Sequence, residues 1–195
     1  MNGDRPNQWL MADPAFGPAV FAALPNQDAM RVTTALAQMQ VWVDHARAQW
    51  ERFQDDMREL RRNSPGWPSW FSRARCDAHL YIVCWSHVGK MMQVATRAAK
   101  QPTMTAFWGK CHAKFDEYDK VRDRLEHFDE RLPGGIRTDE GVDPGDLGRF
   151  DESEFSLGGL TWDIGPSSIQ RLEELALEYI QCVRQTFGLA EPVTT

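Results

Sequence analysis

The hydrophobic positions between residues 27 and 62 recur in alternating steps of four and three, without an interruption. Such spacing places side chains along one face of an α-helix and is typical of a helix that packs against long neighbours. The segment 63–68 contains two prolines and a glycine, which break a helix. The pattern therefore predicts one very long helix over residues 27–62. The face expected to be buried consists of Val32, Leu36, Met39, Val43, Ala46, Trp50, Phe53, Met57 and Leu60.

Three further segments carry hydrophobic residues at helical spacing. A broad apolar arc predicts a second helix over about 75–100, in contact with several neighbours. A third helix is predicted over about 103–131, because proline and glycine follow at 133–135. The last stripe predicts a helix that begins near Ser167 and ends at Gly188, a residue suited to a helix C-cap.

Residues 155–164 alternate between apolar and polar positions about two glycines, which predicts a β-hairpin over about 153–164. Residues 1–26 hold four prolines and no clear period, which indicates an irregular N-terminal arm. The expected fold class is all-α: a four-helix bundle with one very long first helix and a small β-hairpin inserted before the last helix. Residues 27–195 are expected to form this single helical-bundle domain.

The composition of the chain limits the number of domains and the cellular locations that we expect. The length of 195 residues fits one domain, and eight tryptophans and ten phenylalanines can supply a substantial core. There is no run of eighteen apolar residues and no basic segment followed by an apolar one at the N-terminus, so neither a membrane span nor a secretory signal is expected. The four cysteines are scattered through helical segments, which favours reduced thiols and a cytoplasmic location.

The net charge of -6 is unevenly distributed along the chain. Residues 27–127 carry 16 basic and 12 acidic side chains, whereas residues 128–195 carry 5 basic and 14 acidic ones. A protein that coats nucleic acid would show a strong basic excess, so no DNA partner is expected. The mildly basic helical body still allows a small site for one RNA.

One short block on the third predicted helix combines residues suited to phosphodiester chemistry. Arg122 is followed by Asp123, and His127 comes five positions after the arginine. An arginine can bind a phosphate through two parallel hydrogen bonds, and a histidine can take up and release a proton near neutral pH. This combination requires no metal ion or other cofactor, and none is expected.

A helical bundle with an arginine, a polar residue, and a histidine four to six positions after the arginine resembles the HEPN superfamily. The resemblance implies a metal-independent endoribonuclease, in a toxin or defence role, that acts as a homodimer. Arg122 would hold the scissile phosphate and His127 would be the general acid or base, with Asp123 in the polar position. The RNA 2′-hydroxyl would attack its own phosphate. An antitoxin or another protein partner would fit, but Asp129 replaces the tyrosine that one subgroup uses for modification by its antitoxin.

Helix geometry constrains this site. At about 100° per residue, Asp123 and His127 share the outer face of the helix, whereas Arg122 lies at the edge of its apolar stripe. Asp123 could therefore orient the imidazole, and a second surface is needed to bring Arg122 and His127 to one phosphate. A two-fold dimer would provide that surface, so this helix is expected at a dimer interface.

Other interpretations remain open. A second match to the spacing runs from Arg73 to His79, with Ala74 in the polar position. Arg122 could simply pair with Glu126 on a helix surface, and the chain would then be a non-catalytic helical dimer that binds a protein or a ligand. A metal site formed by Cys76, His79 and His87 is less favoured than packing of these residues in the core.

Overall fold

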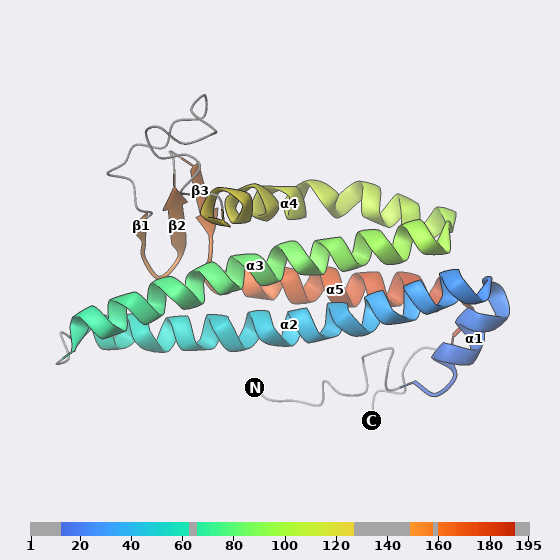
Figure 1. The fold of residues 1–195 in the computed structure, drawn as a ribbon, viewed down its shortest axis with the longest axis horizontal. Helices are drawn as coiled ribbons and strands as arrows, with labels where there is room; N and C mark the ends of the chain where they lie inside the picture. Colours follow the sequence, from blue (N-terminus) through green and yellow to red (C-terminus); the bar gives the residue numbers. More distant parts are fainter. Residues whose placement is uncertain (1–12, 63–65, 127–148, 158–159, 190–195) are drawn as a thin grey trace. The chain divides into compact units, whose positions relative to one another are not determined.

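The computed structural model describes residues 13–62, 66–126, 149–157 and 160–189 (Figure 1). Most of these residues are helical, as the all-α prediction requires, and a small antiparallel sheet follows the fourth helix. In chain order the elements are α1 (Phe16–Ala23), α2 (Asn26–Arg61), α3 (Trp67–Ala99), α4 (Pro102–Glu126), β1 (Arg149–Phe150), β2 (Glu154–Leu157), β3 (Leu160–Asp163) and α5 (Pro166–Thr186).

Backbone contacts divide the chain into two compact units. Unit 1 contains α1, the first half of α2, the second half of α3, the first half of α4 and most of α5. Unit 2 contains the remainder of these four longer helices together with the sheet. That residues 27–195 form a single four-helix-bundle domain stays a prediction.

The N-terminal arm differs from the prediction, because α1 occupies residues 16–23 within it. Phe16 and Val20 are one helical turn apart and are both buried, which gives this short helix an apolar side. Pro18 lies in the first turn, where a backbone N–H would have no partner within the helix, so the proline is tolerated. The very long helix, α2, is consequently the second helix and not the first.

The long helix α2 closely matches its predicted bounds, whereas α3 begins eight residues before its predicted start at Arg75. The prolines and the glycine predict that the whole of segment 63–68 lies between the two helices. Pro68 instead is the second residue of α3, a position that needs no backbone donor. Gly66 precedes the helix with a φ of 93°, a conformation that glycine adopts without strain.

The sheet has the order β1-β2-β3, with antiparallel pairing throughout. The predicted hairpin is confirmed as β2 and β3, in which Phe155 pairs with Trp162 and Leu157 with Leu160. Phe155, Leu157 and Trp162 are buried, as the alternating pattern predicts. The two-residue strand β1 was not predicted, because it is too short for an alternating pattern to appear.

A continuous chain of hydrogen bonds joins the elements of unit 2. The indole N–H of Trp85 lies 2.8 Å from the hydroxyl of Tyr81, which lies 2.6 Å from the hydroxyl of Ser168. Ser168 lies 3.0 Å from the hydroxyl of Tyr118, and Tyr118 donates to the carbonyl oxygen of Asp163 at 2.7 Å. The indole can only donate and the carbonyl can only accept, so each hydroxyl between them accepts one bond and donates the next.

This chain of hydrogen bonds connects α3, α4, β3 and α5 at one place in unit 2. The ring of Trp85 also stacks on that of Tyr118, with centroids 4.2 Å apart and an interplanar angle of 5°. Burial raises the pKa of both Tyr81 and Tyr118 far above the usual tyrosine value, so both hydroxyls keep their protons. The network therefore fixes the ends of α4 and of the hairpin against α3.

Two simple properties complete the fold. Among the described residues, no helix has the length and hydrophobicity needed to cross a membrane. All four cysteines of the chain lie in described helices, and none of them forms a disulfide: Cys84 and Cys111 are buried, Cys182 is half-buried, and Cys76 is exposed.

Candidate functional site

Arg122 is held by other side chains of unit 2. Its Nη1 lies 2.8 Å from the hydroxyl of Ser86 and 2.8 Å from a carboxylate oxygen of Asp119. Its Nε lies 3.2 Å from a carboxylate oxygen of Glu126, as an ion pair without hydrogen-bond geometry. The side chain is only 14% exposed. The alternative that Arg122 pairs with Glu126 is thus confirmed, and its guanidinium group links α4 to α3.

The hydroxyl of Ser86 connects Arg122 and Asp119 through two hydrogen bonds. Ser86 is buried on α3, and it donates a hydrogen bond of 2.6 Å to Asp119 while it accepts one from Arg122. The buried hydroxyl of Ser86 is therefore hydrogen-bonded in both directions where α3 packs against α4. Sequence spacing could not indicate this contact, because Ser86 and Arg122 lie 36 positions apart in the chain.

Of the other two residues in the predicted catalytic group, the structure describes Asp123, which is half-buried on α4. His127 lies outside the described residues, so its predicted pairing with Asp123 stays a prediction.

The two residues of the second match to the arginine–histidine spacing, Arg73 and His79, lie in different surroundings. Arg73 forms an ion pair with the buried carboxylate of Asp56, and its guanidinium carbon lies 4.2 Å from the ring centroid of Trp70. His79 instead lines a pocket. Arg73 therefore has a structural role. A different arginine, Arg75, lines the pocket together with His79.

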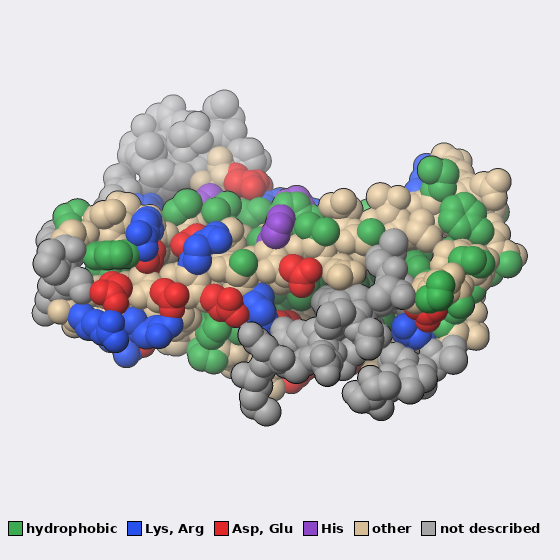
Figure 2. Space-filling view, turned by 90° about the horizontal axis from the view of Figure 1, so that it is seen from below, with side chains coloured by type: hydrophobic (Ala, Val, Ile, Leu, Met, Phe, Trp, Pro, Cys, Tyr) green, Lys and Arg blue, Asp and Glu red, His purple; other side chains and the backbone are tan. Residues whose placement is uncertain are grey.

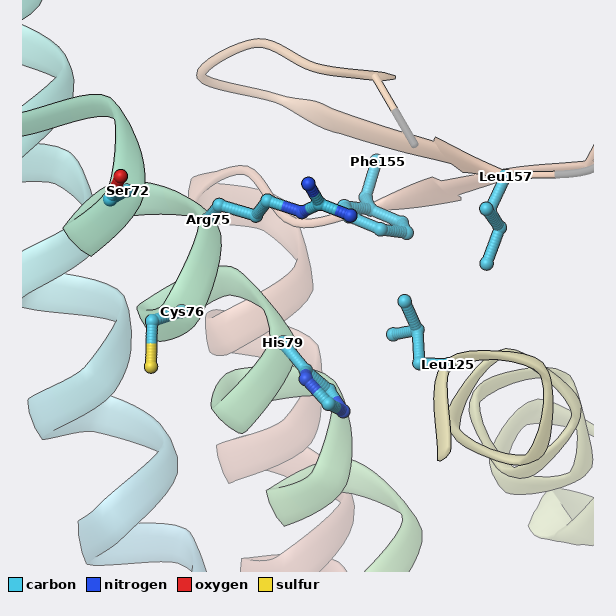
Figure 3. A pocket seen from close by; sticks show the side chains of 7 residues that line it. All are labelled: Ser72, Arg75, Cys76, His79, Leu125, Phe155 and Leu157. Atoms are coloured by element: carbon cyan, nitrogen blue, oxygen red, sulfur yellow. The ribbon is translucent and has the colours of Figure 1, made fainter. Parts of the chain in front are cut away.

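This pocket lies in unit 2, where α3 faces the hairpin and the last turn of α4 (Figure 3). Its volume is about 400 Å³, within the range of small-molecule sites. Figure 3 shows the side chains of Arg75 and His79 extending from α3 toward the residues of the opposite wall. The lining residues are Ser72, Arg75, Cys76, His79, Leu125, Phe155 and Leu157.

The walls of the pocket have different chemical characters. Arg75 and His79 are one helical turn apart on α3 and form a polar wall. Phe155 and Leu157 are alternate residues of β2 and therefore point to the same side of the strand. Leu125 from α4 completes an apolar wall with them. A ligand in this pocket would meet both a cationic group and an apolar surface.

The imidazole of His79 is unusual in its surroundings. Its Nε2 is buried and has no hydrogen-bond partner among the residues that the structure describes. Burial lowers the pKa of His79 below its ordinary value of 6.5; Glu126 acts in the opposite direction, and the positive charge of Arg75 lowers the pKa further. The imidazole is therefore neutral at pH 7.

The predicted metal alternative gains no support from the described residues. Among them, no group of three histidine, cysteine or acidic side chains is arranged to hold a metal ion. His87 stacks on Trp42 in unit 1, with ring centroids 4.2 Å apart and an interplanar angle of 12°. Its aromatic face is used in packing.

The surface near the end of α2 mixes both signs of charge. Figure 2 shows basic and acidic side chains interleaved on the face that it draws. Arg58 pairs with Asp55, and Arg62 pairs with Glu59, each three residues away on the same helix. Such pairs reduce the positive potential that a nucleic-acid backbone would need, so the described part of this face offers no purely basic track.

Comparison with protein-family models, curated proteins and solved structures found no match to this chain.

Proposed function

We propose that this chain is a ligand-binding helical protein whose pocket in unit 2 takes up a small organic anion. The observation that supports the proposal is the pocket itself, in which Arg75 and His79 face an apolar wall formed by Leu125, Phe155 and Leu157. An arginine can form charge-assisted hydrogen bonds to a carboxylate, sulfonate or phosphate. The apolar wall would cover the hydrocarbon or aromatic part of the same molecule.

The alternative of a functional site at Arg122 has less support from the contacts. A phosphate at Arg122 would have to compete with Asp119 and Glu126, two carboxylates already beside the guanidinium group. It would also have to replace the hydrogen bond from Arg122 to Ser86. The hydroxyl of Ser86 is buried, so the loss of its donor would cost about 1–3 kcal/mol, whereas the carboxylates of Asp119 and Glu126 are 45% and 44% exposed. Arg75 also has an interaction partner of its own, so its advantage over Arg122 is the pocket that it lines.

Binding of 8-anilinonaphthalene-1-sulfonate (ANS) tests the proposal, because this probe combines one sulfonate with an aromatic body. We expect saturable binding with one strong site, measured by ANS fluorescence and by titration calorimetry. Arg75→Gln should raise the Kd about 10-fold or more, since a hydrogen bond to a charged group contributes about 1.5–3 kcal/mol. Lys120→Gln makes the same change of charge at an exposed position on α4 and should leave the Kd unchanged.

Equal affinities of the wild type and of Arg75→Gln would contradict the proposal, because the probe would then bind elsewhere. Loss of affinity in both variants would point to a general effect of net charge and would also contradict it. Thermal unfolding followed by circular dichroism shows whether each variant is folded. Leu157→Asn serves as a second probe of the opposite wall and should also weaken binding.

A second candidate is the metal-independent endoribonuclease with Arg122, Asp123 and His127 as its catalytic residues. One observation favours it: Glu126, the residue before His127, is close enough to raise the pKa of His79, and Leu125 lines the pocket. The pocket beside the end of α4 could receive part of an RNA in this candidate. In this candidate the protein is a cytoplasmic homodimer, controlled by an antitoxin or another protein partner.

Incubation of the purified protein with total RNA in EDTA distinguishes the two candidates. The nuclease candidate predicts that the wild type cuts RNA and that His127→Ala loses about 10²- to 10⁴-fold of this activity, the usual contribution of a general acid or base. Products should carry a cyclic phosphate, and sedimentation should show a dimer. If neither protein cuts RNA, the ligand-binding proposal remains and the nuclease is excluded.

A further inference from the structure

We propose that the acidic group of the bound anion bridges Arg75 and His79, and that binding takes up one proton on the imidazole of His79. This inference rests on the proposed function, because it concerns the same pocket. It adds two properties to that function. The ligand carries a compact oxyanion next to an apolar body, and its affinity depends on pH in a defined direction.

The spacing of Arg75 and His79 provides the first support. Residues four apart on a helix have their Cβ atoms about 5–6 Å from each other and point to one side. Both side chains line the same pocket, as Figure 3 shows. A sulfonate, phosphate or carboxylate has at least two oxygen atoms, so one such group can accept hydrogen bonds from a guanidinium and an imidazole together.

The unpartnered Nε2 of His79 provides the second support. A buried polar atom without a hydrogen bond costs about 1–3 kcal/mol, and such atoms are rare in folded proteins. A ligand that reaches this atom when the ring turns about its Cβ–Cγ bond would supply the missing partner. An oxyanion can only accept, so Nε2 must then carry a hydrogen. A neutral ring can carry its one hydrogen on Nε2, and protonation of the ring adds a favourable charge to this hydrogen bond.

The charges around His79 set the direction of the effect. The charges that act on it are those of Arg75 from α3 and of Glu126 from α4, and Cys76 is the other titratable residue that lines the pocket. Among the described residues of the hairpin, Phe155 and Leu157 line the pocket, and neither is charged. Burial and Arg75 keep the imidazole neutral in the empty pocket. A bound oxyanion places a negative charge beside the ring and offsets that of Arg75, so it raises the pKa of His79.

The sign of the pH dependence follows from this difference. Above the pKa of the complex, His79 is neutral in both states, and affinity does not change with pH. Between the pKa of the complex and the lower pKa of the empty protein, binding takes up one proton. Affinity therefore rises as the pH falls through this window, by up to about 10-fold per pH unit for one proton.

ANS titrations between pH 5.5 and 8.5 test the inference. The sulfonate stays ionised over this range, so any pH dependence comes from the protein. We expect the Kd of the wild type to fall as the pH falls and to be constant at the alkaline end. His79→Gln should bind with a Kd that does not depend on pH. His112→Gln changes an exposed histidine in unit 1 and should keep the wild-type dependence.

Two further measurements count the protons taken up and check that the protein is folded. Titration calorimetry at pH 6 in two buffers with different ionisation enthalpies counts the protons taken up, and the count should be near one for the wild type and near zero for His79→Gln. Near-ultraviolet circular dichroism at each pH confirms that ANS is binding to the folded protein, because partly unfolded states also bind this dye.

The outcomes separate this inference from the proposed function. Binding that depends on Arg75 but not on pH would overturn the proton uptake and leave the ligand-binding function intact. A pH dependence that persists in His79→Gln would overturn the assignment to His79. Binding that is indifferent to Arg75→Gln would overturn the proposed function and this inference together.

Discussion

Replacing Trp85 with alanine is expected to lower the free energy of unfolding by about 3–5 kcal/mol, the usual effect of removing a buried tryptophan. Trp85 has an exposed fraction of 0%, and its ring stacks on Tyr118. The substitution removes this packing and also leaves the hydroxyl of Tyr81 without its donor. Chemical denaturation followed by circular dichroism measures the change, and the position of Trp85 in unit 2 makes reduced ANS binding a second readout.

Two variants show whether the effect comes from the network or only from lost volume. Tyr118→Phe keeps the ring that stacks on Trp85 but removes the hydroxyl between Ser168 and Asp163, so we expect a loss of about 1–3 kcal/mol. Leu80→Ala lies on the same helix at a position that is 40% exposed and should change stability by no more than about 0.5 kcal/mol. A similar loss for Leu80→Ala and Trp85→Ala would contradict the burial on which this prediction depends.

A second large effect is expected from Gly89→Ala, because α3 and α4 approach closely at this point of unit 1. A Cβ atom at Gly89 would lie 2.6 Å from the Cβ of Phe115 and 2.7 Å from its Cγ. Contacts this short force the backbones apart, and overpacking of this kind costs about 1–3 kcal/mol. In a protein of this size, that loss should lower Tm by about 2–4 °C for each kcal/mol.

Gly109→Ala is the matched control for this prediction. Gly109 lies within α4, and a Cβ atom there would have no neighbour within 4 Å. Alanine should therefore stabilise the protein by about 0.5–1 kcal/mol, through its better helix propensity. The two substitutions are chemically identical and should have opposite signs. If both raise Tm, the close approach of Phe115 to Gly89 is absent in solution.

The regular parts of the fold were predictable because their signals are local. The repeating face of α2 is buried at Val32, Val43 and Phe53, and the alternation in the hairpin places Phe155 inside. Trp50 belongs to the same face but is only half-buried, and its indole donates a hydrogen bond to the carbonyl of Ile164. That contact joins residues 114 positions apart and leaves no trace in the spacing of apolar residues.

The candidate site was less predictable, because its residues come together only through tertiary packing. Leu125 and Phe155 lie on different elements from His79, and no spacing rule connects the three. The arginine–histidine pattern did single out His79, but it paired this residue with Arg73. Arg75 is the arginine that lines the pocket with His79, since residues four apart share a helix face more closely than residues six apart.

Arg122 illustrates the opposite problem. Its sequence context contains what phosphate chemistry requires, and the same context contains Asp119 and Glu126 at the spacings that favour ion pairs on a helix. The buried hydroxyl of Ser86 gives the guanidinium group a third partner, which the spacing of residues along the helix does not indicate. A motif with suitable residue types therefore needs the tertiary contacts of its arginine before a function can be assigned to it.

The four cysteines differ in exposure, so a chemical label can be attached selectively to the one that lines the pocket. Cys76 is exposed and lines the pocket, whereas Cys84 and Cys111 are buried. Burial also raises the pKa of Cys84 to about 12, so this thiol stays protonated and unreactive at neutral pH. A maleimide dye should therefore attach to Cys76 before the buried thiols react. The native sequence thus carries a labelling position in the lining of the pocket, where binding of the proposed ligand can be followed without an engineered cysteine.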